Sequence, residues 1–455
     1  MVSELDTLAG GLLDIVVIEF QQRPTQHRRR LLMMQAFPFT SNAIVRRVKD
    51  ARLDLLTDTR SRRGRRYDLQ ALAWTLLLSM SVGARGLRQA EDLTRSLPPG
   101  IRRVTGIWRR ISDTKLRDTL FMLDYDELRC CLHRMVKAEA RRGNLKPTRL
   151  PLSVVAIDGK EFHTNSQLDH PFVMKVQPDG DRQPYGRLRV HRAHLISADA
   201  AVCLDQLPIE GHTNEAGTIF DTVHEVIGTW GHTGLCDVLA MDAGNCNLAT
   251  ASLIDGRGKG YLMRLKQNQG TIWNFAQTHL ASLGLEEALR VEVERSKGVE
   301  VERRVYRLEL HSGVHTWNHA RQLVRIQTLR FKTDENGVRV QVGEEGNRYW
   351  ISNLGHKQFD EAAWLTMCRQ YWRIENEGNW TADTAWDEDG RNAWATGASE
   401  VLLVGLLRMM ALTLVAVLRR KAQRRQGGRA PTWKQCQREV FAALRVGFER
   451  PLATH

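Results

Sequence analysis

Two short runs of strand-forming residues end in aspartate, and they constrain the fold of this chain more than any other feature. The runs are Ser153-Val-Val-Ala-Ile-Asp158 and Asp237-Val-Leu-Ala-Met-Asp242. From residue 151 to about residue 270 the pattern is strand, strand, strand, helix, strand, which predicts an α/β fold with an open sheet. Because such sheets bind ligands at the carboxyl ends of their strands, we expect Asp158 and Asp242 to lie at one sheet edge.

A third acid, Glu375, lies in a segment with a helical pattern. A helix from Asp360, a suitable N-cap, would place Tyr371, Glu375 and Asn379 on one face. A carboxylate among bulky apolar neighbours is costly unless it has a partner or a function. Glu375 is therefore the favoured third acid, and Asp383 is the alternative.

Three carboxylates from separate elements suit metal-dependent phosphoryl transfer. Mg²⁺ prefers hard oxygen ligands, and two ions about 4 Å apart can activate a nucleophile and stabilise a leaving oxygen. We predict that Asp158, Asp242 and Glu375 are catalytic and bind two Mg²⁺ ions, for which Mn²⁺ would substitute.

The distribution of charge indicates a nucleic-acid partner. Residues 1–150 carry a net charge of +13, residues 151–400 carry −8 and residues 401–455 carry +9, which sum to the formal net charge of +14. Basic flanks can neutralise phosphates while an acidic centre binds cations. The densest basic cluster consists of Arg62, Arg63, Arg65 and Arg66, and we predict that it contacts DNA.

Other features exclude several classes of protein. The seven cysteines are scattered and contain no CxxC pair, which argues against a zinc knuckle or a disulfide framework. The apolar stretch 401–418 is interrupted by Arg408, so we expect a buried helix and no membrane partner. Gly256, Gly258 and Gly260 follow a helix and precede a strand, the reverse of a dinucleotide loop, so no nucleotide cofactor is expected.

Five short motifs in order resemble a known family over most of the chain. They are Ala156-Ile-Asp-Gly-Lys160, His212-Thr-Asn-Glu215, Met241-Asp-Ala243, Lys266-Gln-Asn-Gln269 and Tyr371-Trp-Arg-Ile-Glu-Asn-Glu-Gly-Asn-Trp380. With them the chain resembles the DDE-type insertion-sequence transposases, in the branch that includes the H-repeat-associated proteins. The Arg and Lys that accompany the Glu in a wider transposase signature are absent, since Tyr371 and Ala382 stand there.

This resemblance implies a ribonuclease-H-like catalytic core, preceded by a helical amino-terminal domain. It also implies Mg²⁺-dependent cleavage at the ends of a mobile element, strand transfer into target DNA, and a homodimer on two ends. The protein would work in the bacterial cytoplasm, on the nucleoid. Further residues with a predicted DNA contact are Lys160, Lys266, Asn268 and Gln269, and Trp317, which would stack on an unpaired base.

We divide the chain into five regions. A helical, basic DNA-end-binding region spans 1–150, and the core spans 151–285 and 353–418. A β-rich insertion at 286–352 is indicated by period-2 runs on both sides of Asp334-Glu-Asn-Gly337. Residues 419–455 are predicted to be a flexible basic tail.

Two other functions stay open. One is a non-catalytic DNA-binding protein derived from a transposase, such as a repressor. The other is a host endonuclease with the same core, such as a junction resolvase. The intact set of three acids argues against the first, and the basic amino-terminal region together with the β-rich insertion argues against the second.

Overall fold

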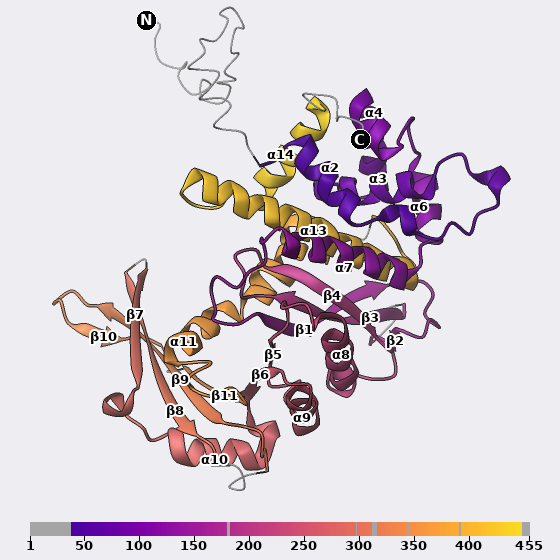
Figure 1. The fold of residues 1–455 in the computed structure, drawn as a ribbon. Coiled ribbons are helices and arrows are strands. Elements are labelled where there is room, and N and C mark those ends of the chain that lie inside the picture. Colours follow the sequence, from indigo (N-terminus) through magenta and orange to yellow (C-terminus); the bar gives the residue numbers. More distant parts are fainter. Residues whose placement is uncertain are drawn as a thin grey trace, which may run out of the picture. The chain divides into compact units, whose positions relative to one another are not determined.

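The computed structural model describes residues 38–447, except 180–182, 297, 312–315, 344–345 and 391–392. The described residues form one compact unit, and Figure 1 shows the order of its helices and strands. Residues 1–37 of the predicted DNA-binding region, and the end of the predicted tail from residue 448, lie outside the described residues.

The described part of the basic amino-terminal region is helical, as expected. Its helices are α2 (Ser41–Asp50), α3 (Leu69–Ser81), α4 (Leu87–Ser96), α5 (Pro99–Thr105), α6 (Asp113–Leu120) and α7 (Tyr125–Arg141). The last two of these helices begin at polar N-cap residues. Ser112 caps α6, and Asp124 accepts a hydrogen bond from the backbone N–H of Glu127 and starts α7.

A mixed sheet follows, and it begins with the strand that carries Asp158. Its first six strands are β1 (Val154–Thr164), β2 (Val173–Val176), β3 (Tyr185–Leu195), β4 (Val202–Ile209), β5 (Val238–Met241) and β6 (Gly260–Leu265). Strand β3 pairs antiparallel with β1 on one side and with β2 and β4 on the other. Strands β1, β5 and β6 are parallel neighbours. The α/β class predicted from the strand and helix pattern is confirmed.

The β-rich segment predicted as an insertion is a continuation of this same sheet. Its strands are β7 (Arg290–Ser296), β8 (Val299–Glu309), β9 (Gln322–Thr333), β10 (Arg339–Gln341) and β11 (Gly346–Ser352). Strand β11 pairs with both β6 and β9, so the hydrogen bonding runs unbroken into the segment. The predicted hairpin is present between β9 and β10, with Gly337 at a φ of 79° in its turn.

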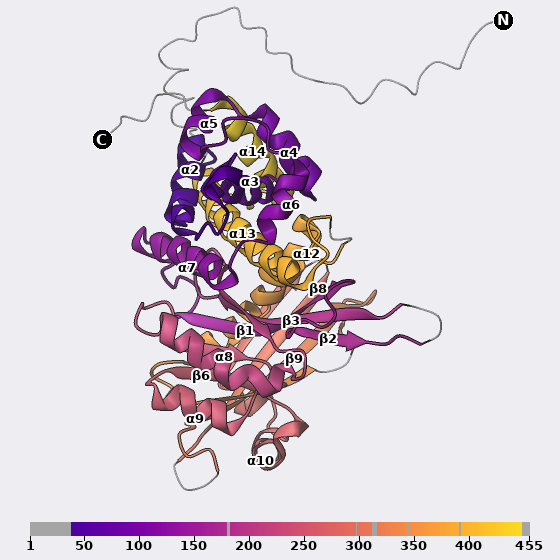
Figure 2. The same ribbon diagram turned by 90° about the vertical axis from the view of Figure 1, so that its right-hand side faces the viewer.

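Helices cover both faces of the first six strands (Figure 2). On one face lie α8 (Glu215–Trp230) and α9 (Leu248–Gly256), and α10 (Gly270–Leu280) packs on β8 and β9. On the other face lie α7 and the long helix α13 (Ala398–Gln426), which contacts β1 and β4. Helix α13 is long and apolar enough to cross a membrane, but its apolar part is wholly buried inside the protein.

The prediction of a flexible tail from Arg419 is wrong for the described residues. Helix α13 continues to Gln426 and ends at Gly427, whose φ of 66° suits a helix terminus. Helix α14 (Trp433–Val446) then packs against α2 and α13. The basic residues are tied into the fold, since Arg419 donates a hydrogen bond to the carbonyl of Pro431 and Arg420 pairs with Glu377.

Candidate active site

Asp158 and Asp242 lie side by side because their strands are parallel neighbours in register. Ile157 of β1 is paired with Met241 of β5, and each aspartate is the next residue. Adjacent strands are about 4.8 Å apart, so the two carboxylates start from neighbouring backbone positions. The two acids are neighbours as predicted, but only Asp242 lies at the end of its strand, because β1 continues past Asp158 to Thr164.

Glu375 reaches the same place from a π-helix (Ile374–Asn379) that follows α11 (Glu361–Gln370). The predicted continuous α-helix from Asp360 therefore changes geometry where Glu375 lies. Wider π-helical turns are frequent at functional sites. The segment continues directly into α12 (Trp380–Trp386).

The three acids are close enough to repel one another. Burial, together with the negative charges of Asp242 and Glu375, raises the pKa of Asp158 to about 7. Burial and the charges of Asp158 and Asp242 also raise the pKa of Tyr371 well above its usual value. The structure thus brings together the three acids selected from the sequence, while their catalytic role stays a prediction. Strongly perturbed carboxyl groups of this kind are frequent in active sites.

A fourth acid, Glu215, adjoins this cluster and was not among the predicted site residues. It is the first residue of α8, after the N-cap Asn214. Its carboxylate lies over Gly159, where an added Cβ would come within 2.2 Å of it. Burial and the charge of Asp242 raise the pKa of Glu215. The signal in the sequence was the Asn214–Glu215 pair at a helix start, which turns the acid towards the sheet.

The carboxylates are the kind of ligand that Mg²⁺ requires, but their oxygen atoms do not converge on one position. Within the described ranges, no three His, Cys, Asp or Glu side chains lie close enough to hold a metal ion together. The donor set of Asp158, Asp242 and Glu375 is all oxygen and carries mutual repulsion that a cation would relieve. Binding an ion there would require these side chains to move together.

Lys160 and Asp383 are engaged with each other, which corrects the prediction for the lysine. The Lys160 Nζ lies 2.7 Å from carboxylate oxygens of both Asp383 and Asp389, and its side chain is 10% exposed. Lys160 is therefore not available for a DNA phosphate in this conformation. Asp383, the alternative third acid, is directed to Lys160, and burial raises its pKa to about 6 despite that partner.

The polar residues after β6 support the loop that carries Asp242. The side-chain amide of Asn268 donates to the carbonyl oxygen of Ala243 at 2.8 Å. The amide of Gln269 donates to the carbonyl oxygen of Cys246. Both amide groups are thus used inside the protein, which argues against the predicted contacts with phosphate or base. Lys266, just before them, is exposed.

The prediction that Trp317 stacks on an unpaired base does not fit its surroundings. The side chain is 4% exposed and packs near Tyr261 and His319, at centroid distances of 6.3 and 6.2 Å. A buried indole offers no face to a base. The exposed tryptophans near the third acid are instead Trp372 and Trp380, on either side of the π-helix.

The predicted basic cluster is on the surface. Arg62, Arg63, Arg65 and Arg66 are all exposed, around a short 3-10 turn at Arg62–Gly64. Arg65 also pairs with Asp58 at 3.4 Å, and the Arg66 guanidinium lies 5.9 Å from the ring centre of Tyr67. Exposure of the cluster is compatible with the predicted DNA contact and does not test it.

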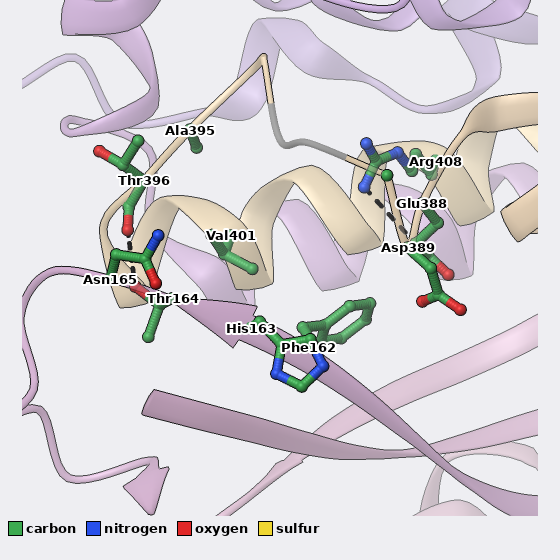
Figure 3. A pocket seen from close by; sticks show the side chains of 11 residues that line it. Phe162, His163, Thr164, Asn165, Glu388, Asp389, Ala395, Thr396, Val401 and Arg408 are labelled. Atoms are coloured by element: carbon green, nitrogen blue, oxygen red, sulfur yellow. Dashed lines mark hydrogen bonds and ion pairs between the residues drawn. The ribbon is translucent and has the colours of Figure 1, made fainter. Parts of the chain in front are cut away.

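A cavity of about 350 Å³ lies between the end of β1 and α13, beside Glu388 and Asp389 (Figure 3). Phe162 and Thr164 of β1, Asp389, and Arg408 of α13 contribute to its lining. Arg408 is 3% exposed, and its guanidinium lies 4.0 Å from the Glu388 carboxylate. The sequence predicted Arg408 only as a break in an apolar run.

Glu377, two residues after the third acid, has a structural role. It pairs with Arg373 and with Arg420, each at 3.0 Å. Burial would raise its pKa, but the two arginines lower the pKa of Glu377 to about 2. Arg373 is itself buried and also donates to backbone carbonyls, so it cannot replace the phosphate-binding arginine of the wider transposase signature.

We expect Glu377→Gln to destabilise the protein by about 2–3 kcal/mol at neutral pH. Because the folded-state pKa is depressed, this stabilisation is present above the unfolded value of about 4.3 and is lost as pH falls towards about 2. Urea unfolding of the variant and the unaltered chain, at neutral pH and at about pH 2, measures the difference in the free energy of unfolding. Glu309→Gln, at a side chain that is 59% exposed, is the control and should cost less than about 1 kcal/mol. Equal effects of the two changes would contradict the structural role.

Comparisons with known proteins give limited information about this chain. No family model matches it, and no curated protein matches it. One solved structure with similarity is a piggyBac transposase synaptic complex with hairpin DNA, at 13% sequence identity and a TM-score of 0.42. The match covers 94% of this chain and 84% of that chain. A similarity of this size is too weak to assign an activity.

Proposed function

We propose that this protein is a DDE-type transposase that cleaves DNA at the ends of a mobile element and transfers the freed strand. The observation that carries the proposal is that Asp158 of β1, Asp242 after β5 and Glu375 of the π-helix lie together, where burial and the charges of the other two acids raise the pKa of Asp158 to about 7. Clustered carboxylates are what a divalent metal site requires.

The topology supports a ribonuclease-H-like core. Strands β1, β3 and β4 are antiparallel, and β5 and β6 add to β1 in parallel, with α8 between β4 and β5. The predicted order of three strands, a helix and a strand is present, and the structure adds the short strand β2 between the first two. The first acid lies within β1, the second directly follows β5, and the third comes from the last helical part, after the antiparallel extension.

In the proposed reaction the three acids would hold two Mg²⁺ ions. When bound, the ions lower the pKa of an attacking water or hydroxyl and stabilise the leaving oxygen. Asp158 must give up its proton before it can act as a ligand, since burial and its neighbours favour the protonated form. Asn268 and Gln269 keep the loop after Asp242 in place. The basic surface would bind the DNA of element ends and target, and two ends would call for a homodimer.

The direct test is a cleavage assay with the full chain on the DNA that flanks its gene. We expect one strand to be cut at each end in Mg²⁺, leaving a 3′-hydroxyl, and no cutting in EDTA. Asp242→Asn should bind the same DNA without cutting it. Binding without any cleavage by the unaltered chain would favour the repressor alternative. Cleavage of branched DNA regardless of sequence would favour the resolvase alternative.

The stabilising effect of Mg²⁺ should increase with pH. Asp158 titrates near pH 7 in the folded chain but near pH 4 when unfolded, so without metal its ionisation makes the folded state less stable as pH rises between these values. A bound cation needs the ionised form. We therefore expect Mg²⁺ to raise the melting temperature more at about pH 8 than at about pH 6. Asp158→Asn should remove most of this difference, and a shift independent of pH in both proteins would contradict the proposed site.

The exposed arginines should contribute to DNA affinity without sequence preference. We expect Arg62→Ala with Arg63→Ala to weaken binding to end DNA and to unrelated DNA alike, and to reduce the slope of log affinity against log salt by about 0.9 for each lost phosphate contact. Binding titrations across a range of salt concentrations measure this. Arg295→Ala, at a side chain that is 82% exposed on β7, is the control and should leave the slope unchanged. An unchanged slope in the double variant would remove this cluster from the DNA-binding surface.

A further inference from the structure

We propose that Asn379 is a positioning residue for Asp158, and that the buried Arg192–Glu388 ion pair sets the orientation of the Asn379 amide. The inference rests on the proposed function, because it concerns the readiness of Asp158 to bind a metal ion. It adds a role for Asn379, Arg192 and Glu388, which were not among the predicted site residues.

The contact between Asn379 and Asp158 is direct. The Asn379 side-chain amide donates to Asp158 Oδ2 at 3.3 Å, and Asn379 is only 3% exposed. Asn379 is the last residue of the π-helix in which Glu375 is the second. The same turn therefore supplies both the third acid and a neutral hydrogen-bond donor to the first.

Arg192 decides which way the Asn379 amide faces. Its Nη1 donates to the Asn379 Oδ1 at 3.2 Å. A guanidinium has donors only, so the carbonyl end of the amide must face Arg192 and the NH₂ end must face Asp158. The donor at Asp158 is thus imposed by the chemistry of Arg192.

Glu388 keeps the guanidinium away from Asp158 itself. Arg192 on β3 is the cross-strand partner of Asp158 on β1, so its charge is close by. Its two terminal nitrogens are held by the Glu388 carboxylate, both at 2.8 Å, and both side chains are fully buried. Gln206 accepts from the Arg192 Nε at 3.0 Å.

This arrangement has a clear consequence for metal binding. An arginine paired directly with Asp158 would neutralise the carboxylate and compete with a cation. A neutral amide between them holds the carboxylate in place without cancelling its charge. Groups that orient metal ligands in this way typically change metal affinity by about 10- to 100-fold when they are removed.

The test is Mn²⁺ binding by the full chain, measured by electron paramagnetic resonance, together with melting temperature and DNA affinity. We expect Asn379→Ala to weaken Mn²⁺ binding by about 10- to 100-fold with DNA affinity unchanged. Asn379→Leu, which fills the same space without polar atoms, should do the same and guards against loss of folding. Asn376→Ala, at an exposed asparagine of the same π-helix, is the control and should bind Mn²⁺ normally.

Asp158→Asn, measured in parallel, separates this inference from the proposed function. If Asp158→Asn weakens Mn²⁺ binding while both Asn379 variants bind it as the unaltered chain does, the positioning role is overturned and the metal site stands. If Asp158→Asn has no effect on Mn²⁺ binding and the unaltered chain cuts no end DNA, the proposed function is overturned, and the positioning role with it.

Discussion

Asp158→Asn and Glu375→Gln should each lower Mg²⁺-dependent strand cleavage by at least about 1000-fold, equivalent to about 4 kcal/mol of transition-state stabilisation. An amide is a much poorer ligand for Mg²⁺ than a carboxylate. Each change also keeps the size of the side chain, so DNA binding should persist. The rate of nicking on end DNA, with binding measured on the same DNA, checks both expectations.

Asp383→Asn is the informative comparison, because Asp383 was the alternative third acid. Its carboxylate is bound to Lys160, whose Nζ keeps a second partner in Asp389. We therefore expect an intermediate loss of cleavage. Full loss in Asp383→Asn together with an active Glu375→Gln would move the third ligand to Asp383.

Glu388→Gln should destabilise the protein by about 3–5 kcal/mol. The carboxylate is fully buried between Arg192 at 2.8 Å and Arg408 at 4.0 Å, so its removal leaves buried guanidinium groups without a counter-charge. Burial would raise the pKa of Glu388, but the two arginines lower it, which keeps the ionised form in the folded state. Urea unfolding measures the loss.

The neighbouring residue provides a matched control for this change. Asp389 pairs with Lys160, but its side chain is 57% exposed and Lys160 keeps Asp383 as a partner. Asp389→Asn should therefore cost less than about 1 kcal/mol. A loss in Glu388→Gln as small as in Asp389→Asn would mean that the buried pair contributes little to folding.

Local sequence signals were sufficient for the elements that carry the first two acids. Residues 154–157 of β1 and all of β5 are apolar and buried, and runs of this composition indicate buried strands. The turn between β9 and β10 is also encoded locally. Asp334 accepts hydrogen bonds from the backbone N–H groups of Asn336 and Val338, and Gly337 has a positive φ. These interactions lie within a few residues of one another.

The environment of the site was decided by contacts between distant parts of the chain. Lys160 donates a hydrogen bond to Asp389, which is 229 residues away in the sequence, and Asn379 donates one to Asp158, which is 221 residues away. A pattern of polar and apolar residues indicates which face of an element is buried, but it does not name the partner on that face. For this reason the sequence predicts neither the ion pairs of Lys160 nor the contact between Asn379 and Asp158.

The same dependence on distant contacts explains why the predictions for Trp317 and for the tail from Arg419 are wrong. Trp317 packs near Tyr261 of the distant strand β6, and the basic end of α13 is ordered by Glu377 and by the carbonyl of Pro431. The sequence by itself determined the apolar runs that precede Asp158 and Asp242, the turn and the choice of three acids, because neighbouring residues encode them. Only the tertiary structure decided which charges are paired, because pairing depends on how distant segments pack.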